Sequence, residues 1–262
     1  MVTLRNRAKE KLEKGELCIG LGIRTLRTMD VGRILNTCGY DYAFIDMEHN
    51  AMHIDTAVQM AVACQDADVT PLIRVPGYEH HHASRVLDAG AMGIVFPHVD
   101  TAEQAAKLVS YCKYPPMGHR SAAGAMAQLN YVAVPQAEAC EAVNKNTLIV
   151  IMLESPKAIE NVDAIAAVPG VDVILIGTND LCMEMGTPGQ FAGPKVEDAY
   201  KKVIAACRKH GKHAGMGGIY DETVSQKYIG MGVRFILSGG DLPMFMSAAT
   251  ARAKFLHSVP LK

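Results

Sequence analysis

Three ionisable side chains crowd the stretch YDYAFIDMEHN, where Asp46, Glu48 and His49 follow a short apolar run. A carboxylate three positions before a histidine can orient the imidazole and raise its basicity, so Asp46 and His49 could form a general acid/base pair. The alternative is the polar edge of a solvated loop. These residues alone do not decide between a catalytic base and a loop, and the decision depends on what lies near them.

Two further acids stand at the ends of apolar runs. Glu154 follows IVIML directly, and Asp180 follows VILIGTN. A carboxylate at the end of so apolar a segment is costly to bury unless it pairs with a cation. The simple alternatives are a salt bridge for Glu154 and the first turn of a helix for Asp180, where the helix dipole favours an acid. If the two acids lie together, their hard oxygens suit Mg²⁺ or Mn²⁺, with water and substrate oxygens as further ligands.

A single arginine, Arg74, lies within the apolar run TPLIRV. A guanidinium fixed there could hold a carboxylate or an enolate oxygen through two hydrogen bonds. A structural salt bridge at the same place is an equally good interpretation. No lysine ends any of the apolar runs, so no residue indicates a Schiff-base mechanism.

Short apolar runs rich in β-branched residues alternate with segments of helical period, which is typical of repeated βα units around a parallel sheet. Eight strands are predicted, over 17–23, 42–46, 70–75, 92–97, 147–153, 172–177, 212–218 and 234–240. Eight strands in 262 residues favour an α/β fold of the TIM (β/α)8 barrel type over a doubly wound sheet, and no GxGxxG follows any strand. In such barrels the chemistry gathers at the carboxyl ends of the strands, where the acids and Arg74 are predicted to lie.

We expect one domain over residues 1–262, with one segment that does not fit a bare barrel. Residues 113–131 (KYPPMGHRSAAGAMAQLNY) show no stable period, so we expect a lid or an interface arm there. Helix starts are indicated by a capping box at Asp100 and Glu103 and by Ser155 before Pro156.

Composition excludes several classes of protein. Hydrophobic residues make up 49% of the chain, which excludes disorder, and 26 basic against 27 acidic residues without a basic stripe argue against a nucleic-acid partner. Seven cysteines at spacings unlike those of zinc sites indicate reduced, buried thiols in the cytoplasm. No segment indicates export or membrane insertion. The expected partner is a small molecule.

Seven strings, taken in order, resemble the HpcH/HpaI aldolase family over nearly the whole chain: FIDMEHN, LIRVPG, LDAGAMGIVFPHV, YPPMGHR, IMLES, VDVILIGTNDLCMEMGTPGQF and SGGDL. The resemblance implies a barrel of the phosphoenolpyruvate/pyruvate type and a class II, metal-dependent aldolase. Its best-known members cleave 4-hydroxy-2-oxo acids such as 4-hydroxy-2-oxoheptanedioate or 2-dehydro-3-deoxyglucarate. The products are then pyruvate, or a close analogue such as hydroxypyruvate, and an aldehyde.

The same resemblance assigns roles to residues. It implies that Glu154 and Asp180 bind a divalent metal, Mg²⁺ or Mn²⁺ before Co²⁺ or Zn²⁺, and that Arg74 stabilises the enolate oxygen. Backbone N–H groups around Gly177, Thr178 and Asn179 would hold the pyruvate carboxylate. His49 with Asp46 would take the proton from the C4 hydroxyl through a water, and Glu48 would support them without touching the substrate.

Asp88 matches an acid that in relatives reaches the active site of a neighbouring subunit, so the resemblance implies a homo-oligomer, commonly a hexamer built as a trimer of dimers. Two positions depart from the family pattern: Met152 stands where many relatives carry glutamine, and Gly118-His119-Arg120-Ser121 replaces GxRG in a loop expected to border the pocket. The alternatives are other chemistry of the same metal and enolate, such as oxaloacetate decarboxylation or enolate addition, and a binding protein without catalysis. A binding protein would have no need of the whole set Asp46, His49, Arg74, Glu154 and Asp180, which argues against that alternative, and fold alone does not decide it.

Overall fold

Parallel strands close into an eight-stranded barrel in the order in which they occur along the chain, in a computed structural model that describes residues 4–261. The strands are β1 (Cys18–Ile23), β2 (Tyr42–Asp46), β3 (Thr70–Arg74), β4 (Gly93–Phe96), β5 (Leu148–Leu153), β6 (Val173–Gly177), β7 (His213–Gly217) and β8 (Phe235–Gly240). Each of the eight apolar runs forms one strand, so the prediction of a TIM barrel is confirmed.

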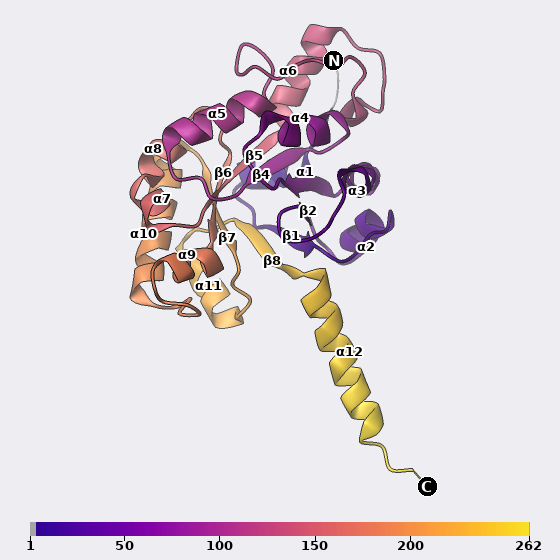
Figure 1. The fold of residues 1–262 in the computed structure, drawn as a ribbon, viewed down its shortest axis with the longest axis vertical. Coiled ribbons are helices and arrows are strands. Elements are labelled where there is room, and N and C mark those ends of the chain that lie inside the picture. Colours follow the sequence, from indigo (N-terminus) through magenta and orange to yellow (C-terminus); the bar gives the residue numbers. More distant parts are fainter. Residues whose placement is uncertain (1–3, 262) are drawn as a thin grey trace.

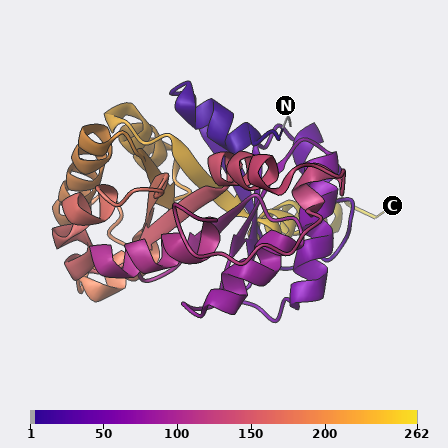
Figure 2. The ribbon, with the colours of Figure 1, turned by 90° about the horizontal axis from the view of Figure 1, so that it is seen from above.

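Most of the helices lie around the outside of the strands, whereas α12 projects away from them (Figures 1 and 2). The helices are α1 (Arg7–Glu13), α2 (Val31–Thr37), α3 (Ile54–Asp66), α4 (His80–Asp88), α5 (Ala102–Cys112), α6 (Gln136–Asn146), α7 (Pro156–Glu160), α8 (Val162–Ala166), α9 (Thr178–Glu184), α10 (Pro194–His210), α11 (Glu222–Met231) and α12 (Asp241–His257), with a 3₁₀ turn, η1, at Ala127–Leu129. No helix within residues 4–261 is long and apolar enough to cross a bilayer.

Two apolar layers hold the barrel together, because successive strand residues point alternately inward and outward. Tyr42 and Phe44 pack inside the barrel with Phe235, while Ala43 and Ile45 face the surrounding helices. Helix α1 closes the amino-terminal end of the barrel, where its Leu12 joins the inner layer. Side chains therefore fill the barrel at its amino-terminal end, and we look for the active site at its carboxyl-terminal mouth.

One expected helix cap is confirmed and the other is shifted by one residue. The Ser155 hydroxyl accepts the N–H of Ala158 ahead of Pro156, as predicted. The capping box before α5 is formed by Thr101 and Gln104 rather than by Asp100 and Glu103. Asp100 instead accepts a hydrogen bond from the Ser155 hydroxyl, which ties the starts of α5 and α7 together.

Residues 113–131 lie at the amino-terminal end of the barrel, because they follow a helix rather than a strand. Lys113 donates to the carbonyls of Asn144 and Thr147, just before β5, and Gln128 donates to the carbonyl of Ala91, just before β4. This end of the barrel is opposite the carboxyl ends of the strands, so the segment does not cover the mouth of its own barrel. A lid over the chain's own barrel mouth does not fit this placement, and an interface arm stays a prediction.

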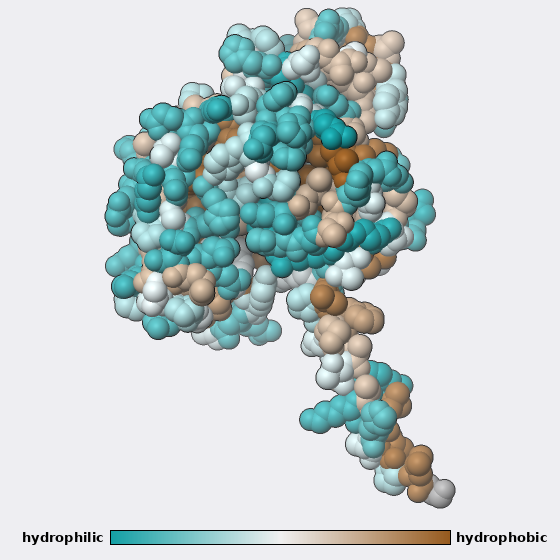
Figure 3. Space-filling view, viewed as in Figure 1, coloured by the Kyte–Doolittle hydropathy of each residue, from teal (hydrophilic) through white to brown (hydrophobic). Residues whose placement is uncertain are grey.

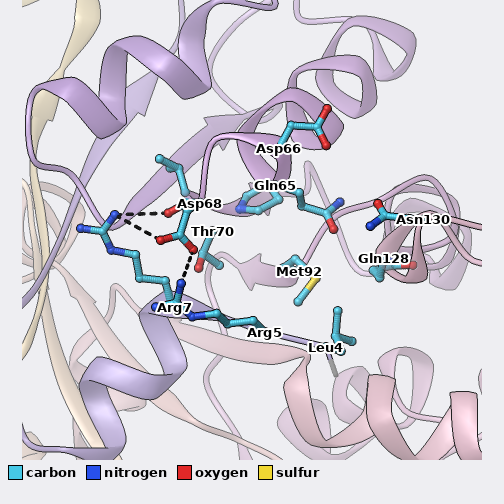
Figure 4. A pocket seen from close by; sticks show the side chains of 12 residues that line it. Leu4, Arg5, Arg7, Gln65, Asp66, Asp68, Thr70, Met92, Gln128 and Asn130 are labelled. Carbon is cyan, nitrogen blue, oxygen red and sulfur yellow. Dashed lines mark hydrogen bonds and ion pairs between the residues drawn. The ribbon is translucent and has the colours of Figure 1, made fainter. Parts of the chain in front are cut away.

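A cavity of about 290 Å³ also lies at this end, beside the first residue of β3 (Figure 4). Its two arginines turn toward one acid: Arg5 Nη1 donates to Asp68 Oδ1 at 2.8 Å, and Arg7 Nη1 lies 3.9 Å from Asp68 Oδ2. The arginine charges are therefore already paired. We assign this cavity to the packing of the amino-terminal segment against the barrel.

The last helix does not complete the outer ring. In Figure 1, α12 runs away from the barrel, and of its residues only Asp241, the first, is buried. Figure 3 shows apolar atoms along the projecting helix. The exposed apolar residues of this segment are Leu242, Met244, Phe245, Met246, Phe255 and Leu256. The helix expected to cover β8 therefore leaves its apolar side uncovered within this chain.

Candidate active site

Side chains from the carboxyl ends of the strands line a cavity of about 230 Å³ at the mouth of the barrel. The lining residues are Arg24, His49, Arg74, Met152, Glu154, Gly177, Thr178, Asn179, Asp180, Gly217, Gly218, Tyr220 and Leu237. Nine of the ten residues expected from the sequence either line this cavity or pair directly with a residue that does. Asp88 is not among them, because it pairs with Arg120 at 2.6 Å beside the 113–131 segment.

The register between β2 and β3 places Asp46 beside Arg74. Arg74 Nε donates to Asp46 Oδ1 at 3.0 Å, and Nη2 donates to Oδ2 at 2.6 Å, which is a bidentate ion pair. Burial by itself raises the pKa of Asp46, but the hydrogen bonds and charge of Arg74 outweigh burial and hold this pKa below its usual value. Asp46 is therefore a carboxylate that orients Arg74.

The expected contact between Asp46 and the His49 imidazole is not formed. Asp46 Oδ1 accepts the backbone N–H groups of Glu48 and His49, at 3.0 and 3.3 Å, so the Asp46 carboxylate holds the turn after β2. The imidazole lies nearer to Glu48, with 3.7 Å between His49 Nε2 and Glu48 Oε2. The physical reason is that Arg74, directly across the β2–β3 pair, offers Asp46 a bidentate ion pair, which an imidazole cannot.

Glu48 lies between Arg74 and His49. Its Oε2 atom lies 2.8 Å from Arg74 Nη1, and its side chain is largely buried. The role expected for Glu48 was a supporting one, and its contacts agree in kind: it touches Arg74 and His49 and does not line the cavity.

Glu154 ends the apolar strand β5 and is only 2% exposed. Its Oε2 atom accepts the backbone N–H of His98 at 2.8 Å, and within residues 4–261 no donor reaches Oε1. Burial raises the pKa of Glu154 to about 7, and the negative charge of Asp180 adds to this effect. The charged form of Glu154 is thus costly, and a second acid, Asp180, lines the same cavity, which is the situation that a bound cation relieves.

His98 is a site residue that the sequence reasoning missed. It follows β4, its φ of 53° is unusual for a residue other than glycine, and its imidazole lies between two acids. Nδ1 is 3.4 Å from Glu154 Oε2, and Nε2 is 3.5 Å from Glu48 Oε1. His98 directly follows the fourth apolar run, and the second, fifth and sixth runs carry predicted site residues at or just after their ends.

The two acids fit a divalent metal. Asp180 lies in the first turn of α9, which follows β6, and Glu154 follows the neighbouring strand β5, so both carboxylates line one cavity. The described residues contain no cluster of three or more His, Cys, Asp and Glu side chains that could hold a metal. A metal would therefore be held by these two acids, with its other positions open to water and substrate oxygens.

Gly177 is required next to Glu154, which makes a direct test possible. A Cβ atom at Gly177 would lie 2.4 Å from Glu154 Oε1, so Gly177→Ala should displace the carboxylate and weaken the binding of Mn²⁺ at least about tenfold by titration calorimetry. The control is Gly230→Ala in α11, where a Cβ meets no atom within 4 Å. Equal Mn²⁺ affinity in both variants would contradict this placement of Glu154.

A model of the family described as HpcH/HpaI aldolase/citrate lyase matches residues 25–248 of the chain. The chain belongs to this family. A 4-hydroxy-4-methyl-2-oxoglutarate aldolase of Hapsidospora irregularis is 38% identical, over 100% of this chain and 98% of that protein. A 2-keto-3-deoxy-L-rhamnonate aldolase of Salmonella dublin is 33% identical, over 98% of this chain and 95% of that protein.

A solved structure of the same family has the same fold as this chain. The HpcH/HpaI aldolase from Desulfitobacterium hafniense DCB-2 superimposes with a TM-score of 0.92 at 30% identity, covering 98% of each chain. The family resemblance stated from the sequence is thus confirmed. As an HpcH/HpaI protein with aldolases as full-length relatives, the chain is an enzyme of the carbon–carbon lyase class.

Of the two departures from the HpcH/HpaI pattern, only one lies in the site. Met152 lines the cavity, with its sulfur 4.0 Å from Arg74 Nη1. Residues 118–121 do not line the cavity, since they belong to the segment at the amino-terminal end of the barrel, and the expectation that they border this pocket is wrong for the chain's own site.

Proposed function

We propose that this chain is a divalent-metal-dependent aldolase that cleaves 4-hydroxy-2-oxo acids to pyruvate, or a close analogue such as hydroxypyruvate, and an aldehyde or second oxo acid. The observation that carries the proposal is the buried carboxylate of Glu154. It lines the same cavity as Asp180, Arg74 and His49, and among the described residues no donor reaches its Oε1 atom. The placement of these groups supports the binding of the 2-oxo acid at the acids and of the hydroxyl-bearing carbon near His49.

Each residue of the site has a part in the proposal. Glu154 and Asp180 would hold Mg²⁺ or Mn²⁺, with Co²⁺ or Zn²⁺ as weaker candidates, and the ion supplies positive charge beside the 2-oxo group when bound. Arg74, fixed by Asp46, would donate to the oxygen that gains charge. The backbone N–H groups around Gly177, Thr178 and Asn179 would bind the substrate carboxylate.

His49 is proposed as the base. Its half-exposed imidazole would take the proton of the C4 hydroxyl, directly or through a water, as the C3–C4 bond breaks and the electron pair moves onto the pyruvate half. Glu48, near His49 Nε2, would orient the ring in place of Asp46. His98 would position Glu154 and Glu48 from the fourth strand.

The test of function incubates metal-depleted protein with several 4-hydroxy-2-oxo acids and measures pyruvate before and after the addition of Mg²⁺ or Mn²⁺. We expect release only with metal. His49→Ala should slow cleavage by about 10²-fold or more, yet spare oxaloacetate decarboxylation, which needs no base at a hydroxyl. The absence of metal-dependent release from every acid would overturn the aldolase proposal, whereas oxaloacetate decarboxylation alone would favour the alternative enolate chemistry.

We further propose a homo-oligomer in which α12 packs on a second copy. A helix of this length is marginal by itself in water, and its exposed apolar side needs a cover. The barrel also exposes Met29 and Ile34 at α2, beside the flank that an eighth outer helix would fill. In its finer form, this proposal is a hexamer in which Asp88 and residues 113–131 lie at another interface.

The unpaired state of all seven cysteines supports the cytoplasm as the site of action.

Sedimentation measures the oligomer directly. We expect the wild-type protein to sediment well above its 28.2 kDa chain mass and Phe245→Glu/Phe255→Glu to shift it to a smaller species, because two buried apolar contacts become charged. Ala205→Glu, on the exposed face of α10, should leave the wild-type mass unchanged. A monomeric wild-type protein, or an unshifted double variant, would count against packing through α12.

A further inference from the structure

We propose that Arg24 binds a second carboxylate on the hydroxyl-bearing half of the substrate, so that the enzyme prefers dicarboxylic 4-hydroxy-2-oxo acids. This inference rests on the proposed function, since it names the substrate class of the same site. Arg24 directly follows β1 and lines the cavity at the barrel mouth.

The position of Arg24 in the barrel places it at the far end of the substrate. In a closed ring of eight strands, β1 and β2 lie across the mouth from β5 and β6. Glu154 and Asp180, on the β5–β6 side, are where the 2-oxo acid end is proposed to bind. A substrate that reaches across the mouth therefore brings its C4 end toward Arg24 and His49.

The guanidinium of Arg24 is only partly used within the chain. Nε donates to Asp46 Oδ2 at 2.8 Å, but Asp46 already has a bidentate partner in Arg74. Among the described residues, no oxygen accepts a hydrogen bond from either terminal nitrogen of Arg24, and its side chain is 50% exposed. Two parallel N–H donors on one edge of a guanidinium match the two oxygens of a carboxylate.

The backbone of Arg24 is held on both sides, as a recognition residue requires. The Asp241 carboxylate accepts the N–H groups of Arg24, Thr25 and Leu26, at 3.2, 2.8 and 2.7 Å. The carbonyl of Arg24 accepts from Arg27 Nη1 at 2.6 Å. A counter-ion that served only to neutralise Asp46 would need no such support. Asp241 begins α12, so the helix that leaves the barrel also holds this loop in place.

The test uses two unreactive ligands that differ only at the far end, 2-oxoglutarate with a carboxylate and 2-oxopentanoate with a methyl group. We expect Mn²⁺-loaded wild-type protein to bind 2-oxoglutarate at least tenfold more tightly by calorimetry. Arg24→Gln should weaken 2-oxoglutarate about 10- to 100-fold and leave 2-oxopentanoate within about threefold. Arg24→Lys, which keeps the charge but loses the planar pair of donors, should fall between the two.

The matched control is Arg33→Gln, which removes the same charge from the exposed surface of α2 and should bind both ligands as the wild type does. No preference in the wild type, or a preference that survives Arg24→Gln, would overturn the assignment. Because binding is measured without turnover, a protein that shows the preference but cleaves no 4-hydroxy-2-oxo acid would overturn the aldolase proposal alone. In a cleaving enzyme, Arg24→Gln should raise KM for 4-hydroxy-2-oxoglutarate and not for 4-hydroxy-2-oxopentanoate.

Discussion

Glu154→Gln is expected to abolish metal-dependent cleavage while leaving the metal-free protein more stable than the wild type. Activity should fall by about 10³-fold or more, because a neutral amide replaces one of the two acids proposed to bind the metal. Stability should rise, because burial holds the pKa of Glu154 at about 7 against its ordinary value of 4.5, which is a cost of roughly 3 kcal/mol when the carboxylate is charged. Glutamine has nearly the same shape and can still accept the N–H of His98.

The dependence on pH distinguishes this explanation from a general effect of substitution. The folded state keeps its proton to higher pH than the unfolded state does, so the cost is absent below about pH 4.5, grows as pH rises and is complete above about pH 7. Chemical denaturation without metal should therefore show the gain of Glu154→Gln at pH 8 and none at pH 4.5. Glu160→Gln, at an exposed position in α7, should change neither activity nor stability. A variant less stable than the wild type at pH 8 would refute the account of Glu154.

Arg74→Ala should lower both stability and every reaction that passes through a pyruvate enolate. Its removal leaves Asp46, which is fully buried, with Arg24 as its one charged hydrogen-bond partner among the described residues. It also takes the nearest arginine from Glu48, so we expect a loss of about 3 kcal/mol. Retro-aldol cleavage and oxaloacetate decarboxylation should fall together by about 10²-fold or more, because both develop charge on the same oxygen.

Urea denaturation and both assays, run at a temperature where the variant is fully folded, check this result. The control is Arg85→Ala, which removes an exposed arginine from α4 and should alter neither property. Retention of oxaloacetate decarboxylation in folded Arg74→Ala would show that Arg74 has only a structural role. Retention of stability would show that the Asp46–Arg74 pair contributes little to the fold.

The strands and the barrel could be predicted from the pattern of apolar residues along the chain. A barrel strand is apolar on both its inner and its outer face, so it is a short apolar run in the sequence, and all eight strands could be predicted. Eight strands that alternate with helices in a chain of this length favoured a barrel. In a barrel the carboxyl ends of all strands meet at one mouth. For that reason residues as distant in sequence as His49, Arg74, Glu154 and Asp180 could be expected to line one cavity, and they do.

Pairing within the site depended on the tertiary structure. Asp46 and His49 are three residues apart in the sequence, which suggested a contact between them. The register of β2 against β3 places Arg74 beside Asp46, and a bidentate ion pair is more favourable than a contact with an imidazole. His98 was missed because its part in the site comes from a left-handed backbone conformation and from acids on two other strands. The position of His98 directly after a strand can be seen in the sequence, but its contacts with these acids cannot.

The sequence by itself determined which elements form and which side chains stand at their ends, because hydrophobic period and strand order are local properties of the chain. Only the tertiary structure decided which acid meets which cation, that residues 113–131 lie at the closed end of the barrel, and that α12 leaves it. These outcomes follow from strand register, from whether a segment follows a strand or a helix, and from packing between elements far apart in the chain. The same packing holds Arg24 at the mouth through Asp241, the first residue of the departing helix.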